Sequence, residues 1–167
     1  MPHPLVTQLR FARRELVRGL EGVSELDAVR RIEPLNCISW MVGHLASQEN
    51  GYWVRAGQSR TLYPGLNDMV GFGKPASTPP LADMWAAWRD ITAAADAYLD
   101  TLTPALLVTH LALAGRRRDE SVGTMLLRNI YHYWYHIGES AAVRQALGHT
   151  QLPQFVGDMS AAAYAPE

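Results

Sequence analysis

Apolar residues recur every three or four positions through four long stretches of this chain, a spacing that predicts amphipathic α-helices. In the first stretch leucines share one face, and arginines lie largely on the others. Asn36 and Ser39 are candidate caps for the start of the second stretch, while Gly57 and Gly148 are the expected stops of the second and the fourth. The four predicted helices cover residues 4–21, 36–56, 81–102 and 122–147.

The segments between these helices carry different signals. A possible cap at Ser24 predicts a short helical turn before Pro34. Residues 58–80 are rich in glycine and proline and show no periodicity, which leaves two interpretations open: a lid or binding loop, or an ordered connection over the helices. Alternating residues at 108–114 allow a short strand or an extended connection, and residues 153–167 predict an extended tail that frays.

The elements and the length of the chain together predict the fold class. Four amphipathic helices within 167 residues bury their apolar faces best by packing as a bundle, and a chain of this size fits one domain. We therefore expect an all-α four-helix bundle with long connecting loops, formed by residues 1–167 as a single domain.

Charge and cysteine content argue against several classes of function. The 15 lysines and arginines are balanced by 16 acidic residues, for a net charge of −1, so we expect no surface for nucleic acid or an anionic membrane. Three arginines at residues 116–118 are followed at once by two acidic residues, as in a solvated loop. The chain has no apolar run near the ~20 residues of a membrane span and no signal-peptide pattern. With Cys37 as the one cysteine, we expect a cytoplasmic protein without an internal disulfide.

The strongest chemical signal is a pair of histidines in the last predicted helix. His132 and His136 are four residues apart, so their imidazoles are only about 40° apart around the helix and point to the same side. Asn129 and Glu139 extend this polar stripe in an otherwise apolar helix, where unpaired polar groups are costly. Two imidazoles one turn apart suit a divalent metal ion, although a backbone carbonyl or a tyrosine would also satisfy either ring.

A third imidazole, His44, lies among apolar residues in the helix predicted at 36–56. Three protein ligands hold a metal and leave an open position for chemistry. His44 reaches the other pair if the two helices are neighbours about 8–10 Å apart. Glu49 lies about 140° from His44 around the same helix, so we interpret it as a structural or supporting residue rather than a ligand. The remaining three histidines fall outside the two inward faces, and we expect no fourth ligand.

Three segments around these histidines form a specific combination. They are SWMVGHLASQENGYW at residues 39–53, NIYHYWYHIGE at residues 129–139, and RQALG at residues 144–148. The most specific parts are a His-Leu pair with a glutamate four residues after the leucine, and a His-x3-His-x-Gly pattern. Together these segments resemble the DinB-like superfamily, which includes the bacillithiol and mycothiol S-transferases and the mycothiol-dependent maleylpyruvate isomerase.

The resemblance implies an up-down-down-up four-helix bundle that holds zinc or nickel through three histidines and frequently forms homodimers. Carried over to this chain, the metal ligands are His44, His132 and His136. The implied reaction is transfer of a low-molecular-weight thiol, of the mycothiol or bacillithiol type, to an electrophilic small molecule. A metal at such a site lowers the pKa of a thiol or of water towards neutrality. Glu139 is then the candidate catalytic residue, either orienting His136 or accepting a proton.

Two other functions would use the same residues. A hydrolase would activate water in place of the thiol at the same metal. A non-catalytic stress-response or binding protein would use the bundle with a structural metal or with none. In either enzyme, Tyr52 or Tyr135 is expected to line the pocket.

Overall fold

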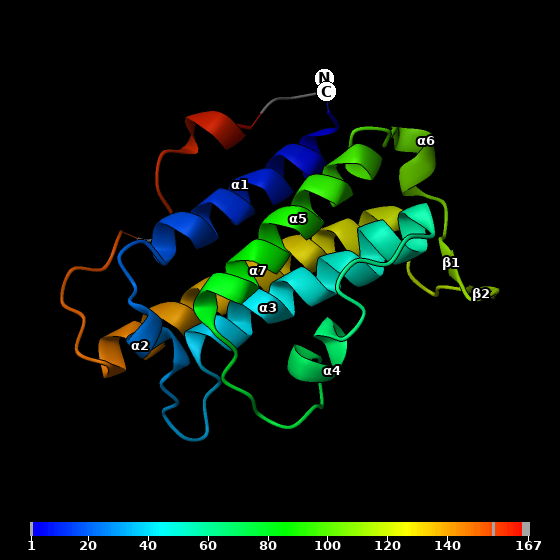
Figure 1. Cartoon of the computed structure of the whole chain (residues 1–167). Coiled ribbons are helices and arrows are strands. Elements are labelled where there is room, and N and C mark those ends of the chain that lie inside the picture. The colour runs from blue at the N-terminus through cyan, green and yellow to red at the C-terminus, as the bar shows by residue number, and fades with distance from the viewer. Residues whose placement is uncertain (1, 155, 165–167) are drawn as a thin grey trace.

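Four long helices lie alongside one another in the computed structural model, which describes residues 2–154 and 156–164 (Figure 1). They begin and end close to where the apolar spacing predicts, and the predicted all-α class is confirmed. Among the described residues, none of the helices has both the length and the apolar character needed to cross a lipid bilayer. The long helices are α1 (Pro4–Gly19), α3 (Ile38–Glu49), α5 (Leu81–Leu99) and α7 (Val122–Ala146).

The second long helix changes its hydrogen-bond pattern within the predicted stretch 36–56. It is an α-helix as far as Glu49 and continues as a π-helix, η1 (Asn50–Ala56). A π-helix is wound more widely than an α-helix, which changes the direction in which the following side chains point. The start also differs in detail, because Cys37, between the two predicted cap residues, takes the cap position and makes no capping side-chain hydrogen bond.

Shorter elements fill the connections between the long helices. Ser24 accepts a hydrogen bond from the amide of Asp27 and begins the predicted turn as α2 (Glu25–Val29). The 58–80 segment contains α4 (Leu66–Val70), which packs against α3, so this connection is ordered. The other short elements are the antiparallel pair β1 (Ala112–Leu113) and β2 (Arg116–Arg117), α6 (Pro104–Leu107) and the 3-10 helix η2 (Met159–Ala162).

The C-terminal tail is less extended than the sequence predicts. It includes η2, which lies against α1 (Figure 1). The side-chain amide of Gln8 donates to the carbonyl of Ala162 at 2.9 Å, and the backbone N–H of Gly157 donates to the carboxylate of Glu15 at 2.9 Å. These polar contacts hold the tail on the bundle. The parts of the prediction that concern residues 155 and 165–167 lie outside the described residues.

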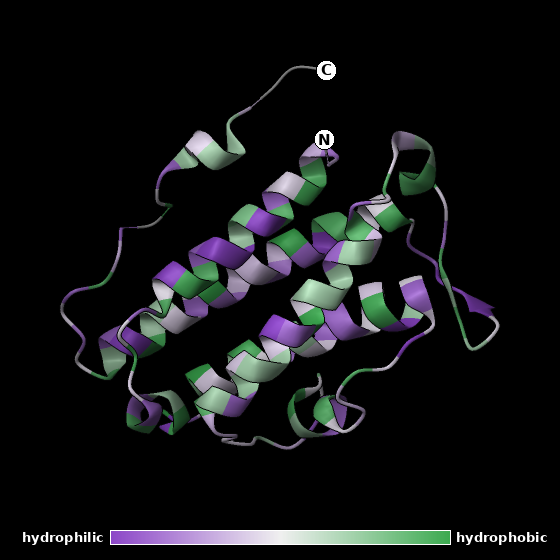
Figure 2. Ribbon diagram, turned by 45° about the horizontal axis from the view of Figure 1, so that its top comes forward, coloured by the Kyte–Doolittle hydropathy of each residue, from purple (hydrophilic) through white to green (hydrophobic). Residues whose placement is uncertain are grey.

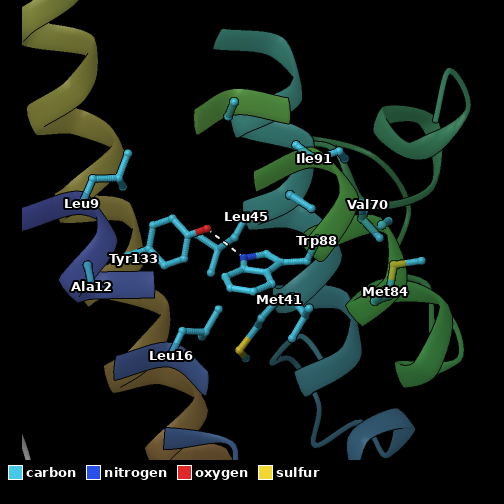
Figure 3. Close-up of a cluster of buried hydrophobic side chains, with 14 of the residues drawn as sticks. Leu9, Ala12, Leu16, Met41, Leu45, Val70, Met84, Trp88, Ile91 and Tyr133 are labelled. Atoms are coloured by element: carbon cyan, nitrogen blue, oxygen red, sulfur yellow. Dashed lines mark hydrogen bonds between the residues drawn. The ribbon is translucent and has the colours of Figure 1, made fainter. Parts of the chain in front are cut away.

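The apolar faces of the four long helices meet in one core. α3 packs against α5 and α7, and α1 packs against α7. Hydrophobic and hydrophilic residues alternate along the ribbons of these helices, as expected when one face of each is buried (Figure 2). Figure 3 shows the centre of the core, where Met41 and Leu45 of α3 and Trp88 of α5 come together with Tyr133 of α7. This packing makes α3 and α7 neighbours, as a site shared between them requires.

A buried polar network ties these helices together. Glu49 is 0% exposed, and its carboxylate accepts hydrogen bonds from Nε and Nη2 of Arg13 and, at 2.6 Å, from the hydroxyl of Tyr133. Arg13 also binds the carboxylate of Asp96 at 2.7 Å. The indole N–H of Trp88 donates to the Tyr133 hydroxyl at 2.8 Å (Figure 3). All four long helices share this network, and Glu49 is a structural residue, which is one of its two predicted roles.

Burial and the adjacent carboxylate of Glu49 raise the pKa of Tyr133 well above its usual value. The phenol therefore stays protonated and donates to Glu49 while it accepts from Trp88. The network is thus matched donor to acceptor at each of these contacts, and Glu49 and Tyr133 within it are fully buried.

Candidate metal centre

Three histidines from two helices converge beside the core. His44 comes from α3, while His132 and His136 come from adjacent turns of α7. One ring nitrogen from each residue lies within 4.8 Å of a ring nitrogen from each of the other two. The ring centroids are separated by 4.6 to 5.2 Å. The structure therefore brings together the three residues that the sequence predicts as metal ligands.

Two of these rings are oriented by acceptors that fix the position of their protons. Nδ1 of His44 lies 2.7 Å from the backbone oxygen of Val70. Nδ1 of His136 lies 2.7 Å from the carboxylate of Glu139. Because a carbonyl and a carboxylate only accept, both Nδ1 atoms carry a proton, an arrangement that in a neutral imidazole leaves the lone pair on Nε2. Glu139 thus contacts the nitrogen of His136 that faces away from the other two ligands.

The Nε2 atoms of His132 and His136 face each other at 3.0 Å. Nδ1 of His132 lies 2.8 Å from the side-chain oxygen of Gln48, so this ring also presents a lone pair on Nε2. Two lone pairs at this separation repel each other unless a positive charge lies near both. Burial, reinforced by the neighbouring imidazoles, lowers the pKa of His132 to about 3, and burial lowers the pKa of His44 to about 4. At neutral pH the rings of His44 and His132 are therefore uncharged, and a divalent cation fits the three nitrogen donors.

Trp40 covers one side of this cluster. Its indole stacks on the ring of His44, with centroids 4.4 Å apart and an angle of 14° between the planes. The same indole meets the ring of His136 edge-on, at 6.3 Å between centroids. Both Trp40 and His136 are buried. These contacts restrict the orientation of two of the three imidazoles and exclude water from that side of the site.

A cavity of about 920 Å³ opens in front of His44 and His132. Ser47, Gln48 and Asn67 give part of its wall polar character. Tyr52 and Tyr135, the two tyrosines expected from the sequence, both line it, together with Tyr131 and Phe72. Phe72 is 94% exposed. The cluster therefore has a closed side against Trp40 and an open side that a small molecule can reach.

One arginine lines the cavity and a second packs on a residue of its wall, and both have defined partners. Arg128, which lines the cavity, is paired with the carboxylate of Glu120 through both Nε and Nη2. The guanidinium of Arg118 lies over the ring of Tyr52, 4.9 Å from its centroid. The interpretation of residues 116–118 as a solvated loop is therefore incomplete, because Arg118 packs on a residue of the cavity wall.

The structure adds residues to the site that sequence reasoning did not assign to it. Val70 contributes a backbone carbonyl, which leaves no trace in the sequence. Phe72 lies in the glycine- and proline-rich segment, where absence of periodicity was the available signal. Gln48 lies one turn after His44 on the same stripe, and this spacing is the signal that could have identified it. His110 lies elsewhere and binds the carbonyl of Arg118 at 3.0 Å through Nδ1.

Within residues 2–154 and 156–164, His44, His132 and His136 form the one group of histidine, cysteine or acidic side chains close enough to hold a metal ion. No curated protein matches this chain. The family model described as mycothiol-S-transferase matches residues 4–148, a range that includes all four long helices up to Ala146 and all three converging histidines. This agrees with the DinB-like resemblance of the histidine segments. The chain belongs to the mycothiol-S-transferase family.

Proposed function

We propose that this protein transfers a low-molecular-weight thiol to an electrophilic small molecule, using a divalent metal ion held by His44, His132 and His136. The observation that carries the proposal is the convergence of three imidazole nitrogens, two of them from residues that line an open cavity, His44 and His132. Membership of the mycothiol-S-transferase family favours mycothiol as the thiol. Zinc and nickel are the metals that we expect, because both accept neutral imidazole ligands.

The residues of the site determine what chemistry a bound cation supplies. Three neutral imidazoles contribute no charge, so a divalent cation there keeps its full charge and lowers the pKa of a thiol to give a thiolate at neutral pH. Val70 and Glu139 keep the protons of His44 and His136 on Nδ1, which leaves Nε2 available as a ligand. We propose that Glu139 acts in this way, through His136.

The cavity supplies the space for both substrates. Its volume of about 920 Å³ lies within the range of about 300–1,000 Å³ that is usual for small-molecule sites. The polar side chains of Ser47, Gln48 and Asn67 offer hydrogen bonds to a hydrophilic thiol. The aromatic rings of Phe72 and Tyr131 offer apolar surface to an electrophile. The site therefore provides two kinds of surface within reach of His44 and His132.

The test combines metal analysis with an assay of thiol consumption. Protein purified without an affinity tag is analysed for bound metals, and the rate of conjugation of 1-chloro-2,4-dinitrobenzene is measured with mycothiol, bacillithiol, glutathione or cysteine. We expect about one metal per chain and a metal-dependent rate that is highest with mycothiol. His132→Ala should lose both, while His110→Ala, a histidine outside the site, should keep both.

The proposal would be contradicted if the metal-loaded protein failed to accelerate the reaction with any of the four thiols. Turnover of an ester or amide without any added thiol would instead identify a hydrolase that uses the same three histidines. If His44, His132 and His136 can each be replaced by alanine with loss of stability as the sole effect, the metal is structural.

A further inference from the structure

A chain of hydrogen bonds runs from the buried indole of Trp53 to Nδ1 of His132. The indole Nε1 of Trp53 lies 2.7 Å from Oδ1 of Asn129. Nδ2 of Asn129 lies 2.9 Å from Oε1 of Gln48, and the same oxygen lies 2.8 Å from Nδ1 of His132. Each of its three hydrogen bonds crosses between the α3–η1 helix and α7. It links a residue of the π-helical segment to a predicted metal ligand.

The direction of every bond in this chain follows from its first member. An indole nitrogen donates and cannot accept, so Asn129 must present its oxygen to Trp53. The amide nitrogen of Asn129 is then the group that faces Gln48, which must accept through its oxygen. Because that oxygen also faces Nδ1 of His132, the proton of His132 must lie on Nδ1.

Burial prevents the chain from being reversed. Trp53 and Asn129 are both 0% exposed, so water cannot replace either partner. Rotating the amide of Asn129 by half a turn would set its N–H groups against the indole N–H, and a second donor would face the first in the core. Gln48 is held from two sides at once, since both Asn129 and His132 donate to its oxygen. One arrangement of protons therefore satisfies all four groups.

We propose that Trp53, Asn129 and Gln48 are positioning residues that set the tautomer of His132, so that Nε2 is unprotonated before any metal arrives. The remaining two ligands obtain the same tautomer from acceptors that cannot donate, a backbone carbonyl and a carboxylate. Gln48 is different, because a side-chain amide can present either a donor or an acceptor. The buried indole removes this ambiguity.

The consequence of the wrong tautomer is loss of a ligand. If Nδ1 of His132 lost its proton, Nε2 would carry it and would point an N–H at Nε2 of His136, 3.0 Å away. A protonated nitrogen has no lone pair for a metal. The inference concerns the metal-free protein, and it rests on the proposed function only in assuming that a metal occupies the three histidines.

The test uses two replacements of the half-buried Gln48, which distinguish the effect of its acceptor oxygen from the effect of its size. Gln48→Met keeps the length of the side chain and removes the acceptor, whereas Gln48→Glu keeps an oxygen for both Asn129 and His132. Because the glutamate also changes the charge of the cavity wall, activity is not the measured quantity. The tautomer of His132 is read from the ¹⁵N chemical shifts of its imidazole in the metal-free protein at pH 8, and metal affinity is measured by competition with a chromophoric chelator.

We expect His132 to carry its proton on Nδ1 in the unmodified protein and in Gln48→Glu. In Gln48→Met the Nε2-protonated form should appear, and the affinity for zinc should fall about 10- to 100-fold, as for loss of other residues that orient metal ligands. The inference is overturned if His132 of the unmodified protein carries its proton on Nε2, or if Gln48→Met changes neither the tautomer nor the affinity. Failure of the thiol-transfer assay would leave these ¹⁵N shifts as they are, so the two proposals are tested separately.

Discussion

Gln48 of α3 holds the ring of His132 on α7 through a contact of 2.8 Å. One turn earlier on the same helix lies His44, so α3 contributes both a predicted ligand and the residue that orients another. The geometry of the three imidazoles therefore depends on the separation of α3 and α7. This separation is maintained by core packing and by the Arg13–Glu49–Tyr133 contacts, which lie beside the site and outside it.

Metal binding should stabilise the fold, because three ligands from two helices are brought together in the folded state alone. At a free metal concentration about 100 times the Kd, the expected gain is about 2.7 kcal/mol. Thermal denaturation with zinc or nickel should show a higher midpoint than denaturation with a chelator. His44→Ala should remove most of this difference. An equal metal-induced shift in His44→Ala would show that the ion binds elsewhere.

Replacing Asn129 by aspartate should invert the hydrogen-bond chain. In Asn129→Asp the new carboxylate still accepts from Trp53 but cannot donate to Gln48. The amide of Gln48 then turns its N–H groups towards the carboxylate and towards His132, whose Nδ1 becomes an acceptor. We expect the Nε2-protonated tautomer of His132 at pH 8 and zinc affinity reduced at least about tenfold. Retention of the proton on Nδ1 would show that the direction is not set by Asn129.

Removing the carboxylate of Glu49 should destabilise the protein strongly. Glu49→Ala leaves the guanidinium of Arg13 without its buried partner, a change that typically costs about 3–5 kcal/mol. Tyr133→Phe removes one hydroxyl from the same network and should cost about 1–3 kcal/mol. Urea denaturation measures both. Folded Tyr133→Phe should still bind one metal per chain, since its hydroxyl contacts none of the three histidines.

The contact between Glu15 and the C-terminal tail predicts a pH dependence of stability. Hydrogen bonds from Arg18 and from the backbone of Gly157 lower the pKa of Glu15 below its usual 4.5. A carboxylate with a lowered pKa stabilises the folded state above its unfolded pKa, and this contribution is lost as the pH falls through the folded value.

Glu15→Gln should therefore be less stable than the unmodified protein at pH 7, and this difference should shrink as the pH falls below about 4.5 and disappear below the lowered folded pKa of Glu15. Free energies of unfolding measured in urea at pH 7 and at pH 3.5 provide the comparison. Glu21→Gln, in which the exposed glutamate has no tail contact, serves as the control. A difference between Glu15→Gln and the unmodified protein that stays constant across this range would exclude the ionised contact as its cause.

Regular spacing predicts the helices and the shared face of His132 and His136, whereas the set of three ligands that includes His44 is implied by the resemblance to the DinB-like superfamily. His132 and His136 share a face whatever the tertiary structure, and the angle between His44 and Glu49 separates the inward imidazole from the carboxylate that binds Arg13. Contacts that depend on tertiary structure could not be predicted in the same way. The carbonyl of Val70 reaches His44 from 26 positions along the chain.

The π-helical turn is the second feature that spacing could not predict. The directions of side chains calculated for an ideal α-helix no longer apply after Glu49, because the π-helix η1 begins at Asn50. Trp53 lies within this segment, and its indole donates to Asn129 of α7. The direction of the hydrogen bonds that end at His132 therefore depends on a contact between Trp53 and Asn129 that helical spacing does not predict.

The residues that line the cavity differ in how far they can be substituted without disturbing the fold. Its floor, His44 and His132, is held by Val70 of α4 and Gln48 of α3, whereas Phe72, Tyr131 and Tyr135 are exposed. Substitutions in these aromatic side chains alter the shape of the opening at little cost to the fold. Evolution can thus exchange one electrophile for another by remodelling the entrance, while the chemistry at the base stays the same.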